Sequence, residues 1–184
     1  AAPALRRPAL LAAYRLSLLP PERSLLEDDT PPVAALNERI YLTAGLAAGQ
    51  RAALTALRIG QAVLCAAPSQ PLNAAFARLA PLDVLRLELP LRLDDAAVRV
   101  NALAARGHTG GSTTLLVGGD GYTGCGTLAA ACLIASEGLS AYDAILRVRE
   151  ACPAAVLDML RIAEFEAAHA AKVIPHRASW LLNL

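Results

Sequence analysis

Residues Val117 to Thr127 read V-G-G-D-G-Y-T-G-C-G-T, and this stretch joins the apolar run Thr113–Val117 to the run Leu128–Ser136. The first run is typical of a buried strand and the second of a helix, so the order predicts a strand, a glycine-rich loop and a helix N-terminus. Backbone N–H groups and the positive end of the helix dipole converge in such a loop and form a cradle for anions. The loop holds no Cys, Ser or His where a nucleophile would lie, and no Lys or Arg to hold a phosphate. We therefore interpret it as the remains of a catalytic loop.

Length and composition favour one domain that contacts a protein partner. At 184 residues the chain is long enough for one compact domain with an extension and too short for two ordinary domains. Hydrophobic residues make up 55% and charged residues 18%, so part of the apolar excess is expected to face a partner, although each alanine buries little area. A net charge of +1 gives no general attraction to nucleic acid. No apolar run reaches the roughly 18 residues of a membrane span.

The cysteine and histidine positions predict neither a disulfide framework nor a metal site. The four cysteines are widely spaced and include no C-x-x-C pair, which favours thiols in a reducing compartment. They are Cys65, Cys125, Cys132 and Cys152. The three histidines, His108, His169 and His176, have no carboxylate or Cys at ligand spacing, so solvated or capping roles are expected. We predict no metal and no cofactor.

Strands alternate with helices through most of the chain, and a run of helices follows. The hydrophobic periodicity predicts strands at Arg39–Leu42, Ala62–Ala66, Val84–Leu89 and Thr113–Val117. It predicts helices at Gln50–Leu57, Leu72–Leu79, Ala96–Ala105, Gly126–Ser136, Ala141–Arg149 and Ala154–Ala170. Asp94 or Asp95 is expected to cap the start of the helix at Ala96–Ala105, and the turn cluster Gly107–Gly111 is expected to end it. Ser140 is expected to cap the next-to-last helix, and Pro153 is expected to be the first residue of the last one. This order predicts an α/β fold with a mostly parallel central sheet flanked by helices.

The ends of the chain differ from its middle. Residues 1–35 contain two Pro-Pro pairs and the acidic cluster Glu27–Asp29, and they are expected to form an extended N-terminal arm. Residues 36–170 are expected to form the domain. Residues 171–184 are expected to be a C-terminal tail in which Trp180 packs back on the domain or docks on a partner. Arg6, Arg7 and Arg15 precede the first acidic residue, which resembles an organellar targeting remnant and predicts a mitochondrial location, or otherwise a cytoplasmic one.

A second stretch connects the chain to a known family. Thr127 to Pro153 reads T-L-A-A-A-C-L-I-A-S-E-G-L-S-A-Y-D-A-I-L-R-V-R-E-A-C-P. It resembles the dual-specificity phosphatases of the protein tyrosine phosphatase superfamily, in which the helix after the phosphate loop runs into a Gly-hydrophobic-Ser/Thr turn and an A-x-x-x-V-R helix. Leu36–Leu42 is similar to the family's opening strand, and Leu87–Leu91 to the strand before its acid loop. The resemblance covers about residues 36–170 and implies a three-layer phosphatase-like sandwich with a helical C-terminal half.

The family's signature is His-Cys, five residues, Arg, then Ser or Thr, in which the Cys thiolate attacks phosphorus and the Arg binds the phosphoryl oxygens. The resemblance places Val117 at the His position, Gly118 at the Cys position and Gly124 at the Arg position. Gly121 keeps the family's internal glycine, and Cys125 replaces the Ser/Thr. The degenerate phosphate loop thus consists of Gly118, Gly119, Asp120, Gly121, Tyr122, Thr123, Gly124 and Cys125.

Without the thiolate and the guanidinium, the resemblance implies a catalytically inactive pseudophosphatase. Asp120 adds a negative charge that opposes a phosphate dianion. The family's general acid is an Asp in the loop after the strand. Leu93 occupies its position in our register, with Asp94 and Asp95 just beyond, where helix capping is the expected role.

Three alternatives stay open. Cys125 could be a displaced nucleophile, since a helix dipole can lower a thiol pKa, but it lies past the cradle. The loop could retain binding of a phosphoprotein. Residues 119–124 also match G-x-G-x-x-G, the fingerprint of a dinucleotide site, although that fingerprint belongs to the first βαβ unit and here helices are expected to follow.

The expected function is that of a structural or protein-binding subunit of a larger assembly, without a small-molecule substrate. Our specific hypothesis is a mitochondrial ribosome of a protist or an alga. The near-neutral charge favours a peripheral position there, mainly in contact with protein and only peripherally with ribosomal RNA.

Overall fold

The computed structural model describes residues 33–43, 51–65, 82–87, 92–118, 124–153 and 155–181, and within these ranges it leaves out the side chains of residues 51 and 173–181. Its strands are β1 (Ala34–Ala35), β2 (Ile40–Thr43), β3 (Ile59–Leu64), β4 (Asp83–Arg86) and β5 (Thr113–Val117). Its helices are α2 (Arg51–Ala56), α4 (Leu93–Thr109), α5 (Cys125–Glu137), α6 (Ala141–Ala151) and α7 (Met159–Leu181). The predicted helix Leu72–Leu79 lies outside the described residues, as do residues 1–32 of the predicted arm.

The sheet is mostly parallel, with the strand order β1-β2-β5-β3-β4. β5 lies at its centre and pairs in parallel with both β2 and β3. β3 pairs in parallel with β4, and the short β1 pairs antiparallel with β2, with Ala34 opposite Leu42. The apolar sequence T-T-L-L-V suits a central strand because a parallel sheet is covered on both faces. β1 takes in two residues that we expected in the N-terminal arm.

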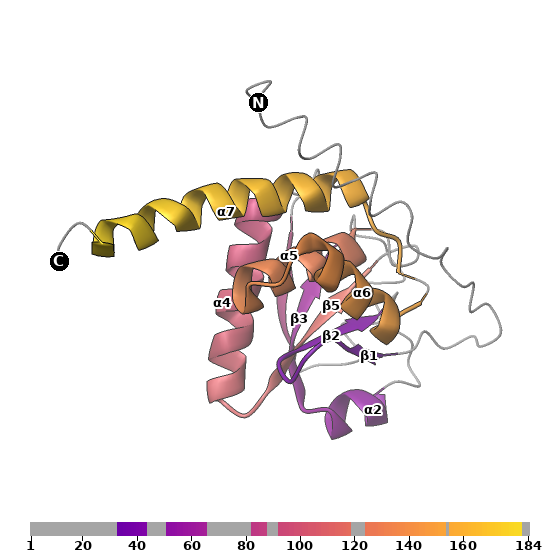
Figure 1. Cartoon of the computed structure of the whole chain (residues 1–184). Helices are drawn as coiled ribbons and strands as arrows, with labels where there is room; N and C mark the ends of the chain where they lie inside the picture. The colour runs from indigo at the N-terminus through magenta and orange to yellow at the C-terminus, as the bar shows by residue number, and fades with distance from the viewer. Residues whose placement is uncertain are drawn as a thin grey trace.

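Helices cover the two faces of the sheet unequally and make three layers (Figure 1). Leu42, Val63 and Leu116 pack in one buried cluster with residues of α4, α5, α6 and α7. Leu115 and Val117 belong to a smaller cluster with Leu54 of α2. Alternate residues of β5 therefore face opposite layers, as the two-residue period of a strand requires. This arrangement confirms the predicted α/β sandwich with a mostly parallel sheet.

Helix α5 lies within the larger layer and is apolar around its whole circumference. All ten residues from Cys125 to Ile134 are buried. A helix that is hydrophobic on every side is stable only when neighbours surround it. The helix after it was predicted closely: α6 begins after Ser140, whose side chain accepts a hydrogen bond from the Asp143 backbone N–H.

Helix α4 is longer than predicted at both ends. Its N-cap residue is Arg92, which makes no side-chain cap hydrogen bond, so the predicted N-cap role for Asp94 or Asp95 is wrong. Both acids lie in the first turn, where negative charge interacts favourably with the helix dipole. The turn cluster Gly107–Gly111 ends the helix as predicted, with Gly110 as the C-cap. Gly107 itself lies within the last turns, buried against Gln61 of β3, so packing on the sheet outweighs the poor helix propensity of glycine.

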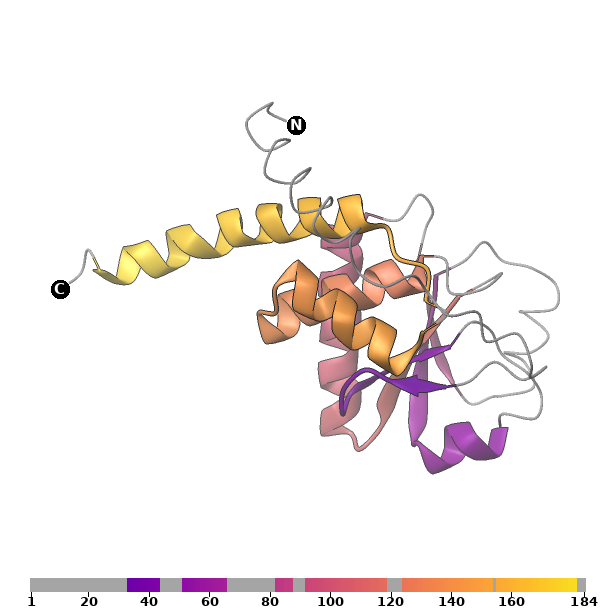
Figure 2. The same ribbon diagram turned by 45° about the vertical axis from the view of Figure 1, so that its right-hand side comes forward.

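Helix α7 begins later and ends later than predicted. Pro153 does not start it, because residues 155–158 are not helical. Asp158 instead precedes the first turn, and its Oδ1 accepts a hydrogen bond from the Arg161 backbone N–H at 3.1 Å. The helix continues past residue 170 to Leu181, so most of the segment predicted as a tail is helical. Its C-terminal part extends beyond the rest of the described domain in both views (Figures 1 and 2). No helix of the described residues is both long and apolar enough to cross a bilayer.

Candidate functional site

The two ends of the glycine-rich loop lie together at the carboxyl edge of the sheet. Gly118 follows β5 directly, and its backbone N–H donates to the Thr43 carbonyl at the end of β2. On the other side of β5, the Cys65 N–H after β3 donates to the Val117 carbonyl. A Cβ atom at Gly124 would lie 3.5 Å from the Cys65 carbonyl oxygen. Gly118 and Gly124 therefore both lie at the carboxyl ends of the parallel strands β2, β5 and β3, and this edge is where ligands bind in open α/β sheets.

The residues between these two glycines lie outside the described part of the chain. They are Gly119, Asp120, Gly121, Tyr122 and Thr123. Gly124 is the N-cap residue of α5, with φ of 81° and ψ of −46°, and its carbonyl accepts the first helical hydrogen bond from Leu128. This conformation suits glycine because a Cβ atom is strained there. The N-terminal N–H groups of α5 follow directly.

The head of α5 is anchored by the segment that precedes α7. A Cβ atom at Gly126 would lie 2.9 Å from the Val156 carbonyl oxygen, so this close approach requires glycine. The Asp158 N–H donates to the Thr127 Oγ1 at 2.9 Å, and Thr127 is buried. The only hydroxyl in the first turn of α5 thus accepts a backbone N–H from the start of α7. It points into the protein and serves the fold.

Cys125 opens α5 and is fully buried. Burial raises the pKa of Cys125 to about 12, and the nearby Cys152 adds a smaller increase. Hydrogen bonds from the backbone N–H groups of Gly126 and Cys125 lower this pKa, but by less. A thiol with this pKa is almost entirely protonated at neutral pH and is a poor nucleophile. Burial therefore outweighs the lowering of this pKa that we expected at the start of the helix, which speaks against Cys125 as a displaced nucleophile. Burial also raises the pKa values of Cys65 and Cys132.

The remaining candidate residues lie on α4 and α7. Leu93, in the register of the family's acid, is buried as the first residue of α4, and Asp94 and Asp95 are exposed. Asp95 is 3.8 Å from Arg99, one turn along the same helix. His108 is exposed near the end of α4, and His169 stacks on Phe165 with ring centroids 5.8 Å apart. His176 lies on α7. No group of three or more potential metal ligands occurs in the described ranges.

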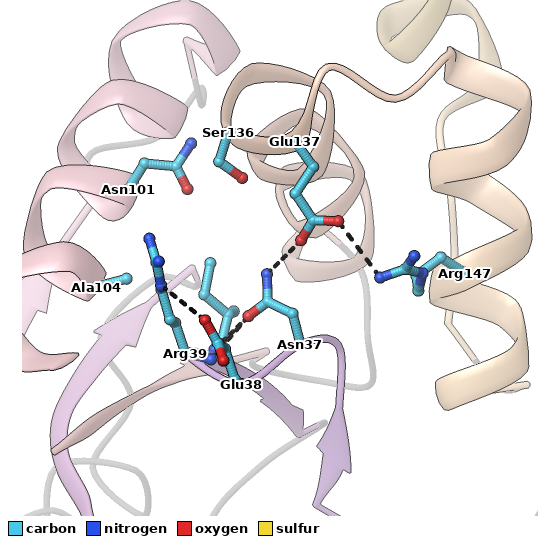
Figure 3. Close-up of a pocket in the computed structure, with 9 residues that line it drawn as sticks. Asn37, Glu38, Arg39, Asn101, Ala104, Ser136, Glu137 and Arg147 are labelled. Atoms are coloured by element: carbon cyan, nitrogen blue, oxygen red, sulfur yellow. Dashed lines mark hydrogen bonds and ion pairs between the residues drawn. The ribbon is translucent and has the colours of Figure 1, made fainter. Parts of the chain in front are cut away.

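A polar pocket of about 340 Å³ lies at the opposite end of α5. Its lining comes from the turn before β2, from α4, from the last turn of α5 and from α6 (Figure 3). Sequence reasoning missed it because its residues come from four elements. They are Asn37, Glu38, Arg39, Ile40, Asn101, Ala104, Ser136, Glu137 and Arg147.

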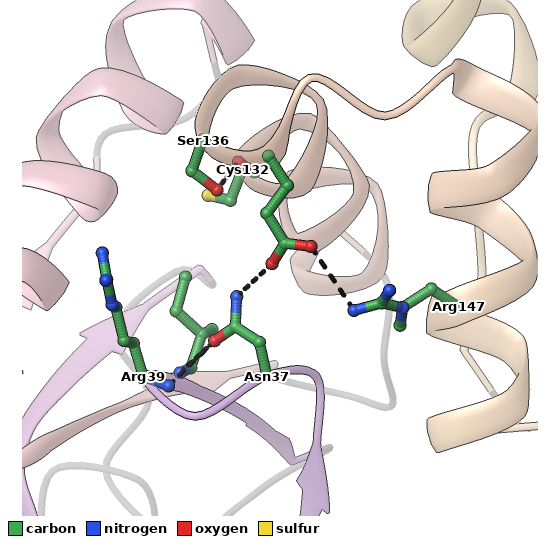
Figure 4. A network of polar contacts seen from close by, with 7 residues as sticks. Asn37, Arg39, Cys132, Ser136 and Arg147 are labelled. Carbon is green, nitrogen blue, oxygen red and sulfur yellow. Dashed lines mark hydrogen bonds and ion pairs between the residues drawn. The ribbon is translucent and has the colours of Figure 1, made fainter.

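Glu137 joins two parts of the lining of this pocket (Figures 3 and 4). Its Oε1 accepts a hydrogen bond from Asn37 Nδ2 at 2.7 Å, and its Oε2 lies 3.4 Å from Arg147 Nη1. Asn37 Oδ1 also accepts the N–H groups of Arg39 and Ile40, which fixes the turn into β2. One carboxylate therefore links the turn before β2 to α6. The Asn37 turn carried a local signal, since Asn side chains commonly accept from the backbone two or three residues ahead. The partner Glu137 is 100 residues away.

Comparison with known proteins gives a match at the level of structure. No protein-family model matches the sequence. No curated protein matches it. The crystal structure of PTPMT1 superposes with a TM-score of 0.66 at 14% identity, covering 78% of this chain and 99% of that one.

Two further structures match with similar coverage. A mouse putative dual specificity phosphatase complexed with zinc tungstate gives a TM-score of 0.59 at 21% identity, covering 82% of this chain and 98% of that one. The crystal structure of human DUSP28 gives a TM-score of 0.57 at 20% identity, covering 77% of this chain and 96% of that one. The sheet order and these matches together show that this chain has the fold of the dual-specificity phosphatases.

Proposed function

We propose that this chain is a catalytically inactive phosphatase-fold domain that serves as a structural or protein-binding subunit of a larger assembly. The observation that carries the proposal is the pair Gly118 and Gly124, which lie together at the carboxyl edge of the sheet and which the family resemblance aligns with the signature's Cys and Arg. Neither glycine can supply a thiolate or a guanidinium. The nearby thiols are buried: burial raises the pKa of Cys125 to about 12, and it raises the pKa of Cys65 as well. A cysteine-dependent phosphoryl transfer then has no nucleophile.

The C-terminal helix supports a role in binding proteins. α7 extends past the body of the domain (Figure 2). The sequence places Val173, Ile174, Trp180 and Leu181 on this extension. Apolar and aromatic residues on a helix that leaves its own domain are suited to the groove of a partner. The assembly that we propose is a mitochondrial ribosome, on the strength of the arginine-bearing first segment and the combination of a degenerate loop with terminal extensions.

Turnover of an aryl phosphate tests the loss of activity. The purified chain is expected to release no p-nitrophenol above the rate without protein, with an active cysteine-dependent phosphatase as the positive control. The variant Cys125→Ser serves as the matched control, because it removes the only thiol at the head of α5. Hydrolysis that the wild type shows and this variant lacks would overturn the proposal.

Two binding measurements separate the proposed role from the alternatives. Calorimetry with phosphotyrosine and phosphothreonine peptides is expected to show no heat above background, whereas a phosphoprotein-binding role predicts saturable heat. A dinucleotide site predicts that NAD raises the melting temperature, and we expect no change because α5 is followed by α6 and α7. Co-sedimentation with ribosomal particles after mild lysis tests the proposed assembly. Recovery of the protein only as a free monomer would contradict it.

A further inference from the structure

The edge of the sheet at β4 carries a groove unrelated to the glycine-rich loop. The groove has a volume of about 400 Å³ and lies between β4 and α4. β4 is the last strand of the sheet within the residues that the structure describes. The lining consists of Asp83, Val84, Leu85, Arg99, Ala102, Leu103 and Arg106.

The outer edge of β4 offers backbone groups for another strand. The Leu87 N–H donates to the Leu64 carbonyl of β3, with Arg86 opposite Leu64 in the register. In a parallel ladder, alternate residues bond to the same neighbour. Asp83, Leu85 and Leu87 therefore point their backbone groups toward β3, and Val84 and Arg86 point theirs outward. Such an edge can accept an added strand.

The walls of the groove select the chemistry of that strand. Leu85 and Leu103 form an apolar floor, because Leu85 is half-buried and Leu103 is buried. Arg99 and Arg106 are exposed on α4, two turns or about 10.5 Å apart along the axis. Asp95 lies 3.8 Å from the Arg99 guanidinium, and Arg106 has no ion pair among the described residues. The lining contains two arginines and one acid, Asp83, so its net charge is +1.

We propose that this groove binds an extended acidic segment of a partner protein, which adds to β4 as a sixth strand. Residues two or four apart on one face of a strand are about 7 or 13 Å apart, which brackets the separation of the two arginines. Two acidic residues with an apolar residue between them, at positions i, i+2 and i+4, therefore place carboxylates near Arg99 and Arg106 and the apolar side chain on Leu85 and Leu103. The proposal does not depend on the state of the glycine-rich loop.

The test measures binding of a fluorescein-labelled peptide of sequence T-E-T-V-T-E-T to the full chain, by fluorescence anisotropy at low salt. Saturable binding is expected, and it should weaken at least about tenfold in the double variant Arg99→Glu/Arg106→Glu. The double variant Arg39→Glu/Arg147→Glu makes the same change in net charge at the polar pocket and should bind normally. Equal loss in both variants, or equal binding of the peptide T-K-T-V-T-K-T, would overturn the proposal.

A second variant tests strand addition itself. Val84→Pro removes an outward N–H and leaves the bonds to β3 intact, so the fold should persist and peptide binding should fall at least about tenfold. Circular dichroism checks the fold. Undiminished binding by a folded Val84→Pro would overturn the proposal. The proposal would also be overturned if the peptide bound only after deletion of residues 22–30. That result would mean that the groove of the full chain holds the chain's own acidic cluster, Glu27–Asp29.

Discussion

At the scale of single residues, the loop and its surroundings depend on backbone shape and on burial. Gly124 combines φ of 81° with a position between the loop and α5. Cys125, the next residue, belongs to the core. Neither property can be read from the sequence alone, because a Gly or Cys letter is equally compatible with an exposed or a buried site. The sequence reveals which groups are missing, and the structure reveals what the groups present do.

The substitution Gly124→Ala measures the strain at the head of α5. A Cβ atom there meets only ordinary contact with the Cys65 carbonyl, at 3.5 Å, so any cost comes from the positive φ. We expect the free energy of unfolding to fall by about 1–3 kcal/mol, as measured by urea denaturation. Unchanged stability would mean that residue 124 does not hold this conformation. Ala135→Gly, within the same helix, provides a comparison in which the alanine has ordinary helical geometry.

The buried thiols predict a decline of stability at alkaline pH. Burial raises the pKa of Cys125 from an ordinary 9.0 to about 12, so the unfolded chain loses this proton first as the pH rises. The stabilisation is complete below pH 9.0 and is lost progressively up to the folded pKa of about 12, at roughly 1.4 kcal/mol per pH unit for one thiol. Urea unfolding in reductant at pH 7 to 10 measures it. The variant Cys125→Ala should show a shallower slope, and an equal slope would contradict this assignment.

At the scale of elements, the sequence predicted best those helices and strands whose ends are marked by residues close by in the chain. β5, α5 and α6 were predicted to within about two residues, because an apolar run, a glycine turn and the Ser140 cap mark their ends. The errors occur where long-range packing decides. α4 begins at the buried Leu93, three residues before its predicted start, and it continues through Gly107, which packs on Gln61, before it ends within the predicted turn cluster. The polar pocket was missed because Asn37 meets Glu137 only after folding.

The start of α7 provides a test of such a long-range contact. Thr127→Val keeps the shape of the side chain and removes the oxygen that accepts the Asp158 N–H. A buried donor without a partner costs about 1–3 kcal/mol, and we expect that loss in urea denaturation. Thr127→Ser keeps the hydroxyl and should lose less. Equal stability of the Val variant and the wild type would show that the contact makes no net contribution.

At the scale of the whole molecule, the domain and its C-terminal extension differ in how they pack. The larger buried cluster reaches Phe165 on α7, whereas the C-terminal part of that helix leaves the body of the domain (Figure 1). The sequence indicated that the end with Trp180 packs back on the domain or docks on a partner, and it gave no sign that this end continues the last helix of the domain. The helical signal there is weak because Pro175 lies within it.

Removal of residues 173–184 should separate these roles. We expect the truncated domain to unfold within about 0.5 kcal/mol of the full chain, because the deleted part lies beyond the core. Its co-sedimentation with the proposed assembly should be lost. A large loss of stability would contradict the division, and unchanged co-sedimentation would place the contact elsewhere. Trp180→Ala in the full chain tests the aromatic side chain alone.

The enclosure of α5 has a consequence for how such a protein can change over generations. Ten consecutive residues of this helix are buried, so its neighbours hold it in place from every side. Helices α4, α6 and α7 are among these neighbours. We therefore expect substitutions in the preceding loop to accumulate with little effect on the stability of the domain, so that a lineage can lose the chemistry of the loop and inherit the same architecture.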